Sequence, residues 1–297
     1  MIEDIMLAQP EGKADHAKTI AYLLLFLTAF GWGLSTVLSK LCVGTISPAH
    51  ILMVRAVIVA GVIFAAAPKR IIAFNRADLK AGALLGFVIF IAYFLGITSL
   101  KYTSASKAGF LMAFNVLFVP AVEAVLKKRL PSKWIMVSVA LSLIGLHLIS
   151  GINGDGFNFG DFLAVLCAAA YTIYTILLDR WGQDKDDFIL AFIQLAVIGM
   201  SSFLIVVLFE EIDIAGVRGS LLPLVFMGVV GTGLATLFQT KAQKTASTES
   251  VGIILLADPL FSLLLAFLFL HEPIFLTGLL GGVLIMLSCM IAIMKKI

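Results

Sequence analysis

The sequence predicts an all-α polytopic membrane protein, with ten transmembrane helices arranged as two inverted repeats of five. Three observations support this expectation: an extreme apolar composition, ten apolar segments of bilayer length, and residues that recur between the two halves. Hydrophobic residues make up 61% of the 297-residue chain and charged residues only 13%. In a soluble domain about 45–50% of the residues are apolar and about 25% are charged. Lipid therefore has to serve as the solvent for much of the apolar surface of this chain.

The ten apolar segments each have the roughly 17–25 residues that a helix needs to cross a bilayer. The connections between them are too short to hold a soluble domain. Helices are the expected spanning element because each one satisfies its own backbone hydrogen bonds within hydrocarbon. The expected spans are 19–43, 48–66, 79–100, 104–126, 134–150, 160–178, 188–208, 220–239, 247–270 and 274–294.

Lysine and arginine residues gather in alternate connections between these spans. If the N-terminus is cytoplasmic, sixteen of the 21 lie in inner segments, four lie at outer ends and Arg55 lies within a span. Cytoplasmic segments carry the excess of positive charge, so both termini are expected in the cytoplasm. Residues 1–18 are then a cytoplasmic tail without a cleavage signal, and the expected location is a plasma membrane of the bacterial inner-membrane kind.

The second half of the chain repeats features of the first at a nearly constant spacing. The segment 101–106 resembles the segment 243–248, and a proline follows each segment at the same distance. Near the start of the two halves, Trp32 lies opposite Tyr171 at a slightly shorter spacing. The repetition indicates two equivalent halves.

Five helices per half is an odd number, so the second half has to enter the membrane from the opposite side. Such a chain is an inverted repeat with a pseudo-two-fold axis in the membrane plane. The expected organisation is a first repeat at 19–150, a linker at 151–159 rich in turn residues, and a second repeat at 160–297.

Several short motifs occur in an order that resembles one family of membrane proteins. They are Phe30-Gly-Trp-Gly-Leu-Ser35, Arg55, Tyr102-Thr-Ser-Ala-Ser106, Asp258-Pro259 and His271-Glu272-Pro273. On these motifs, nearly the whole chain resembles the EamA-type members of the drug/metabolite transporter superfamily. The family usually has a glutamate at the end of the fourth span, where this chain has Leu130.

The resemblance implies secondary active transport of small polar metabolites by alternating access, with export of amino acids or amines as the first expectation. Sugars or nucleotide sugars are the alternative substrates, since a family does not fix a substrate. A non-transporting membrane sensor or assembly subunit is the alternative of another class. An enzyme is not expected, because the spans contain no HExxH motif and no nucleophile–base pair, and the chain has no phosphate-binding loop.

The expected partners are a small-molecule substrate, a proton and the lipid bilayer, and the chain is expected to act as a monomer or a homodimer. No nucleic-acid partner, cofactor or metal site is expected, because the net charge is only +3 and no cysteine or histidine spacing matches a metal site.

Asp258 is the most informative candidate for the binding site. It is about the twelfth residue of its span, near the membrane midplane at roughly 1.5 Å per residue. A lone carboxylate there costs at least about 2.5–3.5 kcal/mol, so it should face a cavity, find a partner or stay protonated. We expect it to bind a proton or a substrate amine, with a structural hydrogen bond as the alternative. Pro259 and Pro120 are candidate hinges because proline donates no backbone hydrogen bond.

Arg55 and Asn115 are further candidates. Arg55 lies opposite Gln194 in the repeat and suits bidentate binding of a carboxylate in a central cavity, although it could also pack its helix against the bundle. Asn115 lies at the depth of Asp258, where inverted-repeat transporters tend to bind substrate. An ordinary hydrogen bond between helices is the alternative for Asn115.

Four aromatic side chains, those of Trp32, Tyr93, Tyr171 and Tyr174, lie within spans instead of at the membrane interfaces. Tryptophan and tyrosine prefer interfaces, so interior ones indicate a polar or wet neighbourhood. Together with Ser35 and Thr36, which follow Trp32 within about one turn, they could line a cavity that accepts an apolar or aromatic side chain. Packing is the alternative for each of them.

Overall fold

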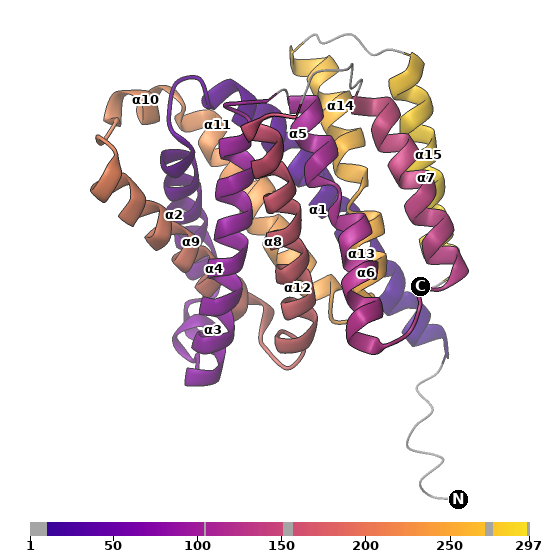
Figure 1. The fold of residues 1–297 in the computed structure, drawn as a ribbon. Helices are drawn as coiled ribbons and strands as arrows, with labels where there is room; N and C mark the ends of the chain where they lie inside the picture. Colours follow the sequence, from indigo (N-terminus) through magenta and orange to yellow (C-terminus); the bar gives the residue numbers. More distant parts are fainter. Residues whose placement is uncertain (1–10, 104, 151–156, 271–275, 296–297) are drawn as a thin grey trace, which may run out of the picture.

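The computed structural model describes residues 11–103, 105–150, 157–270 and 276–295. Every regular element within these ranges is helical, which confirms the expected all-α fold. The long helices run side by side and alternate in direction (Figure 1). In chain order they are α1 (Glu11–Cys42), α2 (Pro48–Ala66), α3 (Pro68–Ile72), α4 (Arg76–Ser99), α5 (Ala105–Met112), α6 (Asn115–Lys127), α7 (Lys133–Ser150), α8 (Phe159–Trp181), α9 (Asp187–Phe209), α10 (Ile214–Gly219), α11 (Leu221–Phe226), the π-helix η1 (Met227–Leu234), α12 (Ala235–Ala242), α13 (Thr248–Ile254), α14 (Ala257–Leu270) and α15 (Leu276–Met294).

Seven helical stretches in the described residues are long and apolar enough to cross a membrane by themselves. Lys133–Leu148 and Leu276–Ile291 are shorter apolar helices, and the expected span 104–126 is divided between α5 and α6. Each of the ten expected spans therefore has a helical counterpart. The number of membrane crossings and the side on which each terminus lies stay predictions. The seven stretches are His16–Cys42, Pro48–Ala66, Arg76–Ser99, Phe159–Trp181, Asp187–Phe209, Leu221–Ala242 and Thr248–Phe269.

The packing of the helices is nearly unchanged when the two halves of the chain are exchanged. α7 packs on α15 and α2 packs on α9, and each pair joins one helix to its counterpart in the other half (right and left edges of Figure 1). The contact of α4 with α8 is matched by the contacts of α1 with η1 and α12. The contact of α1 with α14 is matched by those of α8 with α5 and α6. Matched contacts of this kind are what a pseudo-two-fold axis would produce.

Two of the expected spans are interrupted near their middle. α5 and α6 are separated at 113–114, and α13 and α14 at 255–256. The two breaks are related by the same spacing as the repeated segments 101–106 and 243–248. At both breaks backbone N–H groups bond three residues back instead of four, a tightening that often marks a hinge within a helix.

Pro259 favours the second break. It lies in the first turn of α14, and in an unbroken helix its ring would clash with the carbonyl group of Leu255. Pro120 lies inside α6, beyond the first break. The hinge roles of the two prolines stay predictions, although the chain bends close to Pro259.

α1 crosses η1 at a close contact between glycines. A Cβ atom added to Gly231 would lie 2.5 Å from the Cβ atom of Ser35 and 2.9 Å from the carbonyl oxygen of Gly31. Small residues allow membrane helices to approach this closely. The crossing is therefore specified by side-chain size and holds Ser35 against η1.

We expect Gly231→Val to destabilise the fold, because the added side chain has no room. Overpacking of this kind costs about 1–3 kcal/mol, and the detergent-solubilised protein should melt at a lower temperature. Gly61→Val is the matched control, since a Cβ atom there meets no heavy atom within 4 Å. Equal melting temperatures for the two variants would show that the close crossing is absent.

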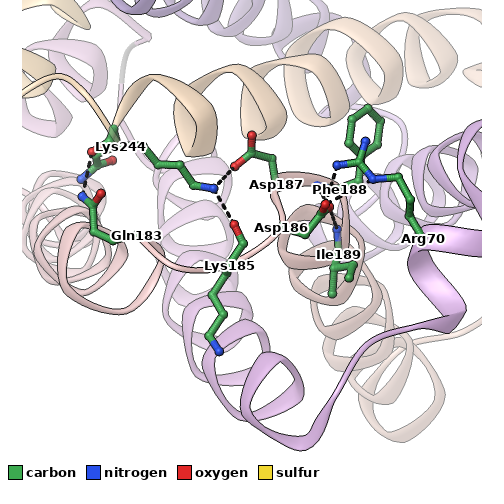
Figure 2. Close-up of polar contacts among 9 residues, drawn as sticks. Arg70, Gln183, Lys185, Asp186, Asp187, Phe188, Ile189 and Lys244 are labelled. Atoms are coloured by element: carbon green, nitrogen blue, oxygen red, sulfur yellow. Dashed lines mark hydrogen bonds and ion pairs between the residues drawn. The ribbon is translucent and has the colours of Figure 1, made fainter. Parts of the chain in front are cut away.

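Polar contacts tie the helices together at the end where the connection between α8 and α9 lies (Figure 2). Asp186 caps α9 by accepting hydrogen bonds from the backbone N–H groups of Phe188 and Ile189, at 2.9 and 3.2 Å. The Arg70 guanidinium forms an ion pair with the same carboxylate and lies 4.6 Å from the centre of the Phe188 ring. Asp186 thereby joins α3 to α9.

Asp186→Ala is expected to destabilise the protein by about 0.5–2 kcal/mol, the usual cost of losing a helix cap. Partial burial alone would raise the pKa of the Asp186 carboxyl group, but the hydrogen bonds from Arg70 and from the backbone lower it. A lowered pKa stabilises the fold above the unfolded value of about 3.9, and this contribution is lost as the pH falls through the folded value. The difference in melting temperature between the wild-type protein and Asp186→Ala should therefore shrink as the pH is lowered from neutral to acidic. Asp184→Ala removes an exposed carboxylate and is the control, with no expected change in melting temperature.

Candidate functional site

A cavity of about 260 Å³ lies among α1, α2, α4, α5, α8 and α14. It reaches the surface beside exposed Lys40, at the end of the molecule where α1 and α4 end (top of Figure 1). Both helix breaks border it. The cavity brings together seven of the eight predicted binding residues and the hinge candidate Pro259. The seven are Trp32, Ser35, Arg55, Tyr93, Asn115, Tyr171 and Asp258.

Arg55 lies on α2 and is only 4% exposed. One Nη atom donates to the Ser35 hydroxyl oxygen at 3.3 Å, and the guanidinium carbon lies 5.2 Å from the centre of the Tyr93 ring. Its Nε atom is buried and has no hydrogen-bond acceptor within the described part of the chain. Arg55 is therefore held in place by neutral groups and keeps hydrogen-bonding capacity to spare.

Asp258 and Asn115 lie at the two helix breaks, each close to the start of the second helix segment. Asp258 is partly buried in the first turn of α14, and Ser262 donates to its Oδ1 atom at 3.2 Å. Asn115 begins α6 and is 7% exposed. The N-terminal ends of helices carry partial positive charge, and inverted-repeat transporters use such ends around a central substrate.

Aromatic rings form one wall of the cavity. Trp32 packs edge-on against Tyr171 with ring centres 5.3 Å apart, so the two repeat mates meet directly. Tyr174 lies behind this wall and does not line the cavity. Its hydroxyl group donates to the Gln194 side-chain oxygen at 2.9 Å. This hydrogen bond satisfies the hydroxyl group, so the tyrosine can be buried away from the cavity.

Many lining residues were not predicted from the sequence, and the polar or sulfur-containing ones among them include Lys40, Met112, Cys167 and Ser262. A helical spacing of four could have found two of them. Lys40 lies eight residues after Trp32, and Ser262 lies four residues after Asp258, so each shares a face with a predicted residue. Met112 and Cys167 carry no such signal, because apolar residues occupy every face of a membrane helix.

The charged groups on the cavity are two cations, Lys40 and Arg55, and one carboxyl group, Asp258. Most of the remaining lining is apolar or aromatic. No cluster of three histidine, cysteine, aspartate or glutamate residues that could hold a metal ion occurs in the described ranges. The lining of the cavity therefore combines charged groups of both signs with apolar and aromatic surface.

The fold and its cavity between two matched halves are those of a polytopic membrane transporter. Two successive segments, 19–151 and 158–294, each match the EamA-like transporter family. The chain belongs to the EamA-like transporter family. This membership is consistent with the drug/metabolite transporter superfamily and makes the protein a multi-pass membrane transporter, since the family is one of carriers and not of enzymes.

Proteins with similar sequences are also named as transporters. A protein of Archaeoglobus fulgidus named as an uncharacterized transporter is 25% identical over 288 residues, covering 96% of this chain and 90% of its own. An uncharacterized transporter of Clostridium kluyveri is 24% identical over 286 residues, covering 91% and 92% of the two chains. One solved crystal structure has a TM-score of 0.76 at 21% identity, over 92% of this chain and 97% of that one, and supports the fold alone.

Proposed function

We propose that the protein is a secondary active transporter that exports amino acids or related amines by alternating access. The observation that carries the proposal is the placement of Arg55 and Asp258 on one cavity between the two halves of the chain. A buried cation held by neutral groups and a carboxyl group on the same small cavity match a zwitterion.

Each charged group has a proposed role. Arg55 binds the substrate carboxylate, because its planar guanidinium suits bidentate contacts and its Nε atom has no acceptor in the described structure. Asp258 binds the substrate ammonium group or a coupling proton. Asn115 adds an amide hydrogen bond, and the wall of Trp32 and Tyr171 accepts an apolar or aromatic side chain.

The alternative substrates are disfavoured by charge and size. A nucleotide sugar carries two phosphates, whereas Arg55 and Lys40 alone among the described lining residues supply positive charge to the cavity. The volume of about 260 Å³ is also below the range of about 300–1,000 Å³ that is usual for ligand pockets. A sugar fits the cavity better than a nucleotide sugar, but an uncharged sugar would form no ion pair with Arg55 or Asp258.

A non-transporting sensor or assembly subunit is the alternative of another class, and the cavity carries no feature that favours it. The proposed setting is a plasma membrane of the bacterial inner-membrane kind, with both termini in the cytoplasm. The proposed partners are the substrate, a proton and the lipid bilayer, and the chain works as a monomer or a homodimer.

Counterflow in proteoliposomes tests the proposal. Vesicles are preloaded with amino acids, amines, sugars or nucleotide sugars, and uptake of the labelled compound is followed with and without a pH gradient. Saturable exchange of an amino acid or an amine is the expected result, and acceleration by the gradient would support coupling to protons. Exchange of sugars alone would select the alternative substrates, and folded protein that exchanges nothing would favour the non-transporting alternative.

A further inference from the structure

A layer of buried polar side chains closes the central cavity on the side opposite its mouth. Gln239 of α12 donates from Nε2 to the Tyr171 hydroxyl oxygen at 2.6 Å. One turn further along the chain, Gln243 donates to the backbone carbonyl oxygen of Thr175 at 2.5 Å. Both glutamines are at most 2% exposed. We call these four residues the polar layer.

A second pocket of about 270 Å³ lies beyond the polar layer, at the other end of the molecule. Asp179, Gln183, Gln243 and Lys244 contribute to its lining. Tyr171 lines the central cavity and Gln243 lines this second pocket, so the polar layer is the partition between the two spaces. Gln183 strengthens the partition by donating to the Gln243 carbonyl oxygen at 3.1 Å.

The repeat relates this closed layer to the open mouth of the central cavity. Three α1 residues at four-residue steps line the cavity toward its mouth, namely Trp32, Thr36 and Lys40. Their mates on α8, at the spacing that relates Trp32 to Tyr171, are Tyr171, Thr175 and Asp179. Facing them across the mouth is Ile97 of α4, whose mate is Gln239 at the spacing that relates 101–106 to 243–248. The open wall and the closed wall are therefore equivalent faces of the two repeats.

We infer that the polar layer is the inner gate of the translocation pathway, and that Tyr171, Thr175 and Asp179 line the pathway once the gate opens. The inference rests on the proposed transport function. The two halves of an inverted repeat exchange conformations during alternating access, so a face that lines the open side has a mate that lines the other side when it opens. The second pocket is then the inner vestibule.

The polar side chains of this layer are more typical of a gate that opens than of a permanently packed core. An apolar core between α8 and α12 would pack without buried amides, whose burial is costly unless every hydrogen bond is made. The Gln194 amide nitrogen, beside the layer, lacks a hydrogen-bond partner among the described residues. In an open pathway water would satisfy this group, which makes opening less costly.

An ion pair at the surface holds the same side closed. Lys244 pairs with Asp187 at 2.7 Å and joins the end of α12 to the start of α9 (Figure 2). The repeat mates of these residues are Tyr102 and Pro48, near the end of α4 and the start of α2, which form no ion pair because neither side chain carries a charge. The pair of Lys244 with Asp187 on the closed side therefore has no counterpart at the equivalent positions of the other repeat.

Thiol labelling in oriented vesicles tests the gate. The native cysteines Cys42, Cys167 and Cys289 are first replaced by alanine, and Thr36→Cys or Thr175→Cys is introduced. An impermeant thiol reagent should label the Thr36→Cys thiol from the mouth side and leave the Thr175→Cys thiol nearly unlabelled. Adding Gln239→Ala and Gln243→Ala should raise labelling of the Thr175→Cys thiol from the opposite side roughly tenfold, as two lost hydrogen bonds predict.

The matched control is Ser142→Cys, whose site is equally buried but lies between α7 and α15, where Ser142 donates to Ser288 at 2.8 Å. It should stay unlabelled in every background. If the double alanine variant does not fold, Gln239→Met keeps the side-chain length, removes the bond to Tyr171 and should raise labelling in the same direction.

Gate variants that fold and leave the Thr175→Cys thiol unlabelled from the opposite side would overturn the inference, as would labelling from the mouth side alone. Labelling requires no substrate, so it separates this inference from the proposed function. If the Thr175→Cys thiol becomes labelled but the protein exchanges no substrate, the gate inference stands and the proposed transport function is contradicted. If the wild-type protein exchanges substrate but the Thr175→Cys thiol is never labelled, transport stands and the gate inference is contradicted.

Discussion

Arg55→Gln is expected to raise the KM for a zwitterionic substrate roughly 10- to 100-fold, because a charge-assisted hydrogen bond to the carboxylate contributes about 1.5–3 kcal/mol. Glutamine is the residue that the second repeat carries at the equivalent position, Gln194. It keeps a polar side chain on α2 but has no positive charge. Counterflow at several substrate concentrations would measure the change.

Two comparisons make the Arg55 result specific. Arg55→Lys keeps the positive charge but loses the planar guanidinium group that can form two parallel hydrogen bonds to a carboxylate. Its KM is therefore expected to lie between those of the wild-type protein and Arg55→Gln. Arg180→Gln removes an exposed arginine near the end of α8 and should leave the KM unchanged. Wild-type exchange by Arg55→Gln would show that Arg55 only packs α2 against the bundle.

Asp258→Asn should remove both the attraction for a substrate amine and the capacity to exchange a proton at the helix break. The amide is nearly the same size as the carboxyl group and still accepts the hydrogen bond from Ser262, so the fold should be kept. We expect the KM for an amine or amino acid to rise roughly 10- to 100-fold. Acceleration by a pH gradient should also disappear.

Controls separate the two roles of Asp258. Glu211→Gln neutralises an exposed carboxylate outside the helices and should change neither the KM nor the response to pH. Loss of the pH response with an unchanged KM would assign Asp258 to proton coupling alone. Full transport with an unchanged pH profile in Asp258→Asn would remove Asp258 from the site.

The sequence was most informative where residues recur between the halves. Trp32 and Tyr171 were singled out as interior aromatics at equivalent positions, and the structure brings their rings together. Asp258 and Asn115 were placed at the same depth, and both lie at helix breaks on the cavity. Hydropathy could locate the helices because a span is set by its length and apolar content.

Other features depend on which helices face one another, and hydropathy does not report this. Tyr174 lies one turn from Tyr171, yet it faces Gln194 behind the wall. Gln239 is the last residue of an expected span and Gln243 lies beyond it, and their pairing with α8 has no local signal. The π-helix η1 lies where α1 crosses closely at Gly231, and hydropathy reports neither feature.

In the proposed mechanism, one small cavity recognises both charges of a zwitterion. The most direct measurement is competition against amino-acid counterflow by three compounds that share an apolar side chain: phenylalanine, its amide and its N-acetyl derivative. We predict that phenylalanine competes, while the amide, without a carboxylate, and the N-acetyl derivative, without an ammonium group, compete at least roughly tenfold more weakly. Equal competition by all three compounds would contradict recognition by Arg55 and Asp258.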